Sequence, residues 1–112
     1  MKRVAKTSVV DHHERQIEEL REDRELTKGL LEDAIREFLE GDEQAALILL
    51  RDIIAAVCGF PALAEEIDVH PKALHRMLSD RGNPTTTNFA AIVRVLCKRL
   101  GLKPAEHLLV PA

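Results

Sequence analysis

The sequence predicts an all-α protein, a compact helical bundle of about six helices. Leu and Ala are the most frequent apolar residues, and apolar residues make up 46% of the 112-residue chain. They recur at intervals of three and four rather than in alternation, which is the period of helices that bury one side. Glycine, proline and acidic residues divide the chain into segments of helical length. The three aromatic residues are all Phe, so the core is expected to be aliphatic.

Residues 1–28 are predicted to form an N-terminal extension of a domain that spans residues 29–112. Asp11 and Glu14 have the spacing of a capping box, in which both side chains bond to backbone N–H groups at a helix start. A helix is therefore expected from about residue 11 to about residue 25. Its apolar content is thin, so it needs other helices to pack on. That content consists of Ile17, Leu20 and Leu26.

Two further helices are expected over residues 27–40 and 43–58. The first carries a broad apolar stripe and is broken by Gly41. Asp42 is a favourable N-cap for the second helix, and Gly59 ends it. The second helix, EQAALILLRDIIAAVC, is apolar on nearly every side. Such a helix is typical of the middle of a core.

Residues 63–79, LAEEIDVHPKALHRMLS, have the pattern of a helix-turn-helix motif. Asp68 stands where the chain turns, and it is among the few residues besides glycine that tolerate a left-handed backbone. Val69 is expected to fill the turn. Pro71 is favoured at the first position of the second helix. The alternative is that these are two ordinary packed helices of a small bundle.

The second helix of this motif is predicted to contact DNA. Leu74, Met77 and Leu78 share one face, and an outer row is expected on the opposite face, formed by Lys72, His75, Arg76 and Ser79. A short helix with a donor-rich outer row can enter the major groove. Lys72 is placed to reach a base edge, and Arg76 to hold a phosphate. The predicted contacts here are His70, Lys72, His75, Arg76 and Ser79.

A last helix is expected from Thr85 or Thr86 to about Leu100, ended by Gly101. Gly82 is expected to stop the preceding helix. Free N–H groups and short polar side chains at the start of the last helix can hold a phosphate, although ordinary capping explains any one of them equally well. These residues are Asn83, Thr85, Thr86, Thr87 and Asn88. The tail from Leu102 to Ala112 is expected to fold back on the bundle.

Charge is distributed unevenly along the chain, which has a net charge of −3. Residues 11–43 hold 13 acidic and 5 basic residues, whereas residues 60–103 hold 7 basic and 4 acidic residues. The local basic excess is compatible with a DNA-binding face. The acidic region is either a site for a basic partner or a solvated helix surface.

Other classes of function lack sequence support. There is no glycine-rich phosphate loop and no convincing nucleophile–His–acid set, so no enzyme and no cofactor are expected. The five His do not have the spacing of a metal site. No apolar run reaches about 18 residues, so no membrane span is expected. Cys58 and Cys97 stand among apolar residues and, without an export signal, are expected to be reduced core thiols of a cytoplasmic protein.

The region of residues 30–103 resembles the HigA-type antidote (antitoxin) proteins of bacterial addiction modules, which belong to the lambda-repressor-like helix-turn-helix regulators. The similar segments are FLEGD at 38–42, Leu63-Ala64, KALHRML at 72–78, GNPT at 82–85 and LGL at 100–102. The resemblance implies a helical DNA-binding core, homodimerisation and repression of its own operon. It also implies binding to a small RNase-type toxin encoded in the same operon.

Two hypotheses follow for function. The first is a sequence-specific transcription repressor that binds double-stranded operator DNA and serves as the antitoxin of a type II toxin–antitoxin module. The second is a protein-interaction or dimerisation module that retains the fold without binding DNA. Binding to the DNA upstream of the gene discriminates between them.

Overall fold

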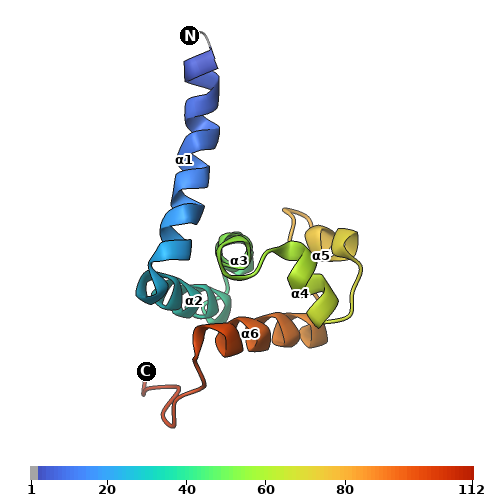
Figure 1. The fold of residues 1–112 in the computed structure, drawn as a ribbon. Coiled ribbons are helices and arrows are strands. Elements are labelled where there is room, and N and C mark those ends of the chain that lie inside the picture. Colours follow the sequence, from blue (N-terminus) through green and yellow to red (C-terminus); the bar gives the residue numbers. More distant parts are fainter. Residues whose placement is uncertain (1–2) are drawn as a thin grey trace.

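Six α-helices make up the regular structure of the described residues in a computed structural model of the chain (Figure 1). The structure describes the backbone of residues 3–112 and the side chains of residues 11–112. The prediction of an all-α fold with about six helices is confirmed. The helices are α1 (Arg3–Glu22), α2 (Arg24–Leu39), α3 (Glu43–Val57), α4 (Phe60–Glu66), α5 (Pro71–Met77) and α6 (Thr86–Leu100).

The first two helices begin earlier than predicted. Asp11 and Glu14 lie inside α1, so the predicted capping box is wrong. Residues 3–10 contain neither glycine nor proline, and nothing there interrupts the helix. α2 begins at Arg24 rather than near residue 27, because Asp23 has an extended backbone and its carboxylate accepts a hydrogen bond from the Leu26 N–H at 3.0 Å.

Thr27 closes the junction between α1 and α2. Its side chain is fully buried, and its hydroxyl lies 2.6 Å from the carbonyl oxygen of Leu20 and 3.0 Å from that of Asp23. The hydroxyl therefore joins the end of one helix to the start of the next. Leu26, predicted as part of the apolar face, is instead 46% exposed. The expected domain boundary at residue 28 falls within α2.

α3 is the central helix, and it contacts α1, α2, α4 and α6. Its buried residues include Ala46, Leu50, Ile53 and Ile54, each at most 1% exposed. The predicted core helix is thus confirmed, although Ile48 faces outward at 48% exposure. The side chain of Asp42 caps its start by accepting from the Ala45 N–H at 3.1 Å, as predicted.

The C-terminal tail runs from the end of α6 toward α2 (Figure 1). Leu108, Leu109 and Val110 line one groove together with Ile35 and Leu39 of α2. The three tail residues nevertheless remain 66%, 74% and 81% exposed. The tail therefore approaches the bundle, as expected, but adds little to its core, since a short irregular segment has few ways to bury its own backbone.

Within residues 3–112, no individual helix has both the length and the apolar composition needed to cross a membrane. α3 and α4 reach that threshold only when taken together, as a pair bent by 96°.

Candidate nucleic-acid interface

The candidate interface is built on α4 and α5, which are joined by residues 67–70. Asp68 has a φ of +59°, the left-handed conformation that the sequence predicts at the turn. Val69 is half-buried, and its N–H donates to the carbonyl oxygen of Ala64 at 2.9 Å. The turn is therefore fastened back onto α4, and it fixes the direction in which α5 leaves.

The inner sides of both helices belong to the main core. Leu63 and Ala64 of α4, Leu74 of α5 and Leu78 at its C-cap are all 0% exposed. Rotation of α5 about its axis would cost Leu74 and Leu78 their close-packed contacts, so the packing favours one orientation of the helix. The opposite side of α5 is thereby held toward solvent.

The predicted outer row is exposed at Lys72, His75 and Arg76. The ring of His75 stacks on Phe60 of α4, with ring centroids 4.2 Å apart and an angle of 10° between the planes. One face of the imidazole is thus covered, while its edge remains open for hydrogen bonds. The prediction that these three side chains contact DNA stays a prediction.

His70 caps the N-terminus of α5. Its Nδ1 atom accepts a hydrogen bond from the Lys72 N–H at 3.1 Å. This bond satisfies one of the free donors at the helix start and fixes the ring against the first turn. A DNA contact from His70 would therefore have to come from the other ring nitrogen.

Ser79 does not belong to the helical row in which the sequence placed it. α5 ends at Met77, and Ser79 lies in the following turn. Its hydroxyl donates to the carbonyl oxygen of Arg76 at 2.7 Å. Such a local side chain–backbone bond competes with helix continuation, which explains the difference from the expected spacing.

Two residues fix the C-terminal end of α5: Arg51, which sequence reasoning did not assign to this site, and Gly82, which is expected from the sequence to stop this helix. Arg51 of α3 donates from its Nη1 atom to the carbonyl oxygen of Leu78 at 2.9 Å and lies 3.7 Å from the carboxylate of Asp80. Gly82 passes so close that an added Cβ would lie 2.0 Å from the carbonyl oxygen of Arg76. Both ends of α5 are therefore held by specific contacts. The signal available for Arg51 was a lone arginine in a mostly apolar helix.

The polar cluster predicted as a phosphate clamp surrounds the start of α6. Thr85 is the N-cap, and its hydroxyl accepts from the Asn88 N–H at 3.1 Å. Thr86 and Thr87 are exposed in the first turn, Asn88 is half-buried, and Asn83 is exposed in the preceding loop. The structure thus brings four of these residues together at one helix end, where the free N–H groups and the helix dipole favour an anion.

Basic side chains predominate on and just after α5. Lys72, Arg76 and Arg81 are all exposed, and the exposed acid closest to them in sequence is Asp80. The side chain of Asp80 is 90% exposed and lies near Arg51. Residues 71–81 thus hold three basic residues and one acidic residue, whereas the exposed acids Glu65, Glu66 and Asp68 lie just before α5.

Cys58 and Cys97 are free thiols, as predicted, and they pack against the edge of the core rather than inside it. Both are half-buried. Burial raises the pKa of each thiol, and for Cys58 the nearby Arg99 partly offsets that increase. Neutral thiols in this setting are poor nucleophiles and poor metal ligands.

Across the residues whose side chains the structure describes, no group of three or more His, Cys, Asp or Glu is arranged to hold a metal ion. Comparisons of the chain with protein-family models, with curated protein sequences and with solved structures give no match.

Proposed function

We propose that this chain is a sequence-specific transcription repressor that places α5 in the major groove of double-stranded DNA. The observation that carries the proposal is the exposed row of Lys72, His75 and Arg76 on a short helix that is anchored in the core by Leu74, which is 0% exposed. A helix that enters a groove must present donors outward while its orientation is fixed by the domain behind it.

In this proposal the polar residues divide into two roles. Lys72, in the first turn of α5, donates to a base edge, most favourably guanine. Arg76, one turn later, and the residues at the start of α6 hold backbone phosphates and set the register on the duplex. Arg51 and Gly82 act indirectly by holding the end of α5.

The resemblance in residues 30–103 extends the proposal to an antitoxin that acts as a cytoplasmic homodimer and binds a small RNase-type toxin. A dimer suits the geometry, because one short helix reaches only one half-site, and two half-sites about one helical turn apart give usable affinity. Co-expression with the product of the neighbouring gene tests the toxin, and light scattering at micromolar concentration tests the dimer.

The decisive experiment is an anisotropy titration of the promoter region upstream of the gene at two salt concentrations. Lys72→Ala is expected to cost about 1–3 kcal/mol on the cognate site and to relax sequence preference. Arg76→Ala is expected to weaken binding to all sequences and to reduce the log–log salt slope by about 0.9. Arg36→Ala is the matched control, since Arg36 is exposed on α2 and pairs with Asp33 at 2.8 Å.

A protein-interaction module is the second candidate, and the acidic surface of α1 favours it. Glu14, Glu18, Glu19 and Glu22 are all exposed there. This candidate replaces the first if the parent protein binds no upstream DNA at either salt concentration. If the Lys72→Ala, Arg76→Ala double variant binds as tightly as the parent, α5 does not contact the DNA.

A further inference from the structure

A cavity lined by arginines lies where four helices meet. It is formed by the end of α1, the start of α2, the end of α3 and the end of α6, and its volume is about 350 Å³. Its lining residues include Arg21, Arg24 and Arg99 and no acidic residue. Three arginines that share one small cavity can offer their unused N–H donors to the same ligand.

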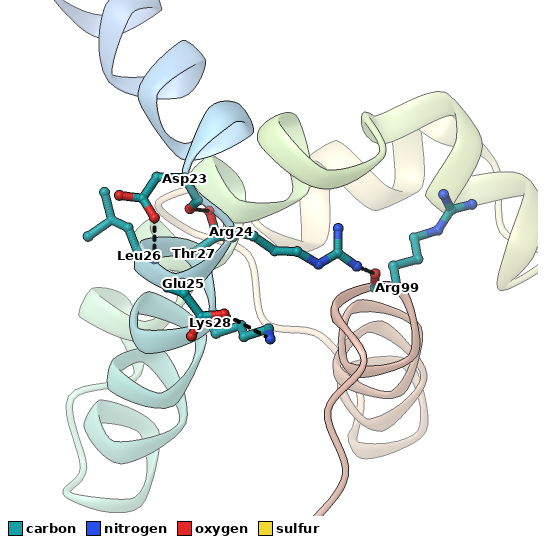
Figure 2. Close-up of polar contacts among 7 residues, drawn as sticks. All are labelled: Asp23, Arg24, Glu25, Leu26, Thr27, Lys28 and Arg99. Atoms are coloured by element: carbon teal, nitrogen blue, oxygen red, sulfur yellow. Dashed lines mark hydrogen bonds and ion pairs between the residues drawn. The ribbon is translucent and has the colours of Figure 1, made fainter.

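Each of the three guanidinium groups is held in place by the protein. Arg21 donates to the carbonyl oxygen of Ala55 at 3.3 Å, and Arg99 donates to the carboxylate of Glu66 at 2.9 Å. Arg24 reaches from α2 to the carbonyl oxygen of Arg99, as Figure 2 shows. The arginines are therefore positioned before any ligand arrives, which lowers the ordering cost of binding one.

One of the three arginines of the cavity, Arg24, has no carboxylate partner among the residues whose side chains the structure describes. Glu18 pairs with Arg21 and Glu66 pairs with Arg99. Within residues 11–112, no carboxylate lies within 4.0 Å of Arg24. A guanidinium group has five N–H donors, so each arginine retains donors beyond those bonds. The carbonyl groups at the ends of α1, α3 and α6 carry partial negative charge, and Arg21 and Arg24 each donate to one carbonyl oxygen, at the end of α3 and of α6 respectively.

We propose that this cavity binds a small anion that carries a phosphate group. The planar guanidinium fork matches phosphate oxygens in a bidentate manner. A volume of about 350 Å³ is at the lower end of the range of small-molecule sites, which favours inorganic phosphate or a small phosphate monoester. The site is separate from α5, since the cavity lies at the α2 end of α6 (Figure 1). It does not depend on whether the chain binds DNA.

Thermal denaturation of the full chain tests the proposal with two probes, inorganic phosphate and adenosine monophosphate, each at 10 mM against sodium chloride of equal ionic strength. For a Kd of about 1 mM, the parent should gain about 5 °C in Tm. A larger gain with the monoester identifies a phosphate monoester as the ligand, and an equal or smaller gain identifies free phosphate. No gain with either probe overturns the proposal.

Substitutions locate the site. Arg24→Gln and Arg99→Gln should each weaken binding about tenfold or more, because each removes charge-assisted hydrogen bonds. Arg36→Gln makes the same change of charge on α2 outside the cavity and should keep the parent's gain. If all three variants keep the gain, the anion binds elsewhere and the proposal is wrong.

Chemical-shift mapping of the ¹⁵N-labelled parent needs no variant and so applies even if a substitution prevents folding. Phosphate should shift the amide signals of Leu20, Val57 and Leu100, which line the cavity. Shifts confined to the start of α6 or to α5 would overturn the assignment.

Discussion

Replacing Gly82 with alanine should force apart the end of α5 and the loop that follows it. The added Cβ would lie 2.0 Å from the carbonyl oxygen of Arg76 and 2.6 Å from the carbonyl carbon and oxygen of Met77. Non-bonded carbon and oxygen atoms approach to about 3.3 Å, so the backbone must move by about 1 Å. The neighbours are backbone atoms that cannot rotate away, and such overpacking costs about 1–3 kcal/mol.

Urea denaturation followed by circular dichroism measures this cost, and the midpoint should fall by about 1 M or more. Gly29→Ala is the matched control, because an alanine Cβ at this position in α2 would meet no atom within 4 Å. That change should stabilise the protein by about 0.5–1 kcal/mol. If the urea midpoint of Gly82→Ala equals or exceeds that of the parent, the loop does not pass as close to the end of α5 as described. The explanation given for how α5 ends would then be wrong.

The same displacement provides a link to function. The new methyl group would displace the carbonyl group of Arg76, so the side chain of Arg76 would move together with the end of the helix. If α5 contacts DNA as proposed, Gly82→Ala should weaken binding to the promoter region beyond what its lower stability explains. Anisotropy titrations at a temperature where both proteins are fully folded separate the two effects.

Four further predictions concern stability. Asp68→Gly should raise stability by up to about 1 kcal/mol, because glycine adopts the φ of +59° without steric cost; a lower Tm would contradict this. Asp23→Ala should cost about 1 kcal/mol through loss of the α2 cap, measured by urea denaturation. Leu74→Ala should cost about 2–5 kcal/mol, since the side chain is 0% exposed, and a smaller loss would mean that α5 repacks. Burial raises the pKa of the Cys58 and Cys97 thiols in the folded state. Their contribution to stability is therefore complete below the unfolded pKa of about 8.5 and is lost as the pH rises through the folded-state pKa. The urea midpoint should be lower at pH 9.5 than at pH 7.5, and a variant with both cysteines replaced by alanine should lack this difference.

The sequence predicts best those features that depend on neighbouring residues. Asp42 and Thr85 cap helices as expected, Pro71 begins α5, and Asp68 adopts the left-handed turn conformation. Each is a local effect of one side chain on the adjacent backbone. The start of α1 was misplaced because a capping pattern at Asp11 is compatible with a helix interior when nothing interrupts the preceding residues.

The contacts that position the candidate interface were harder to predict because they join distant segments. Arg51 is 27 residues from Leu78, whose carbonyl group it bonds. Position 82 requires a residue without a Cβ because the loop passes close to the end of α5, and the spacing of residues in the sequence does not show this approach. Ser79 was placed in the helical row because the sequence pattern does not show that α5 stops at Met77.

The attachment of α1 has a consequence for how the protein opens. Among residues 11–22, Ile17 and Leu20 are buried, and they pack in a small cluster with Ala56 apart from the main core. Local unfolding needs least free energy where few apolar contacts are lost. Amide hydrogens of α1 should therefore exchange much faster than those of α3, and proteases should cleave α1 first. A chain that has lost α1 by cleavage would keep α4 and α5 folded. The protein would therefore lose its N-terminal helix before it loses the candidate DNA-binding surface.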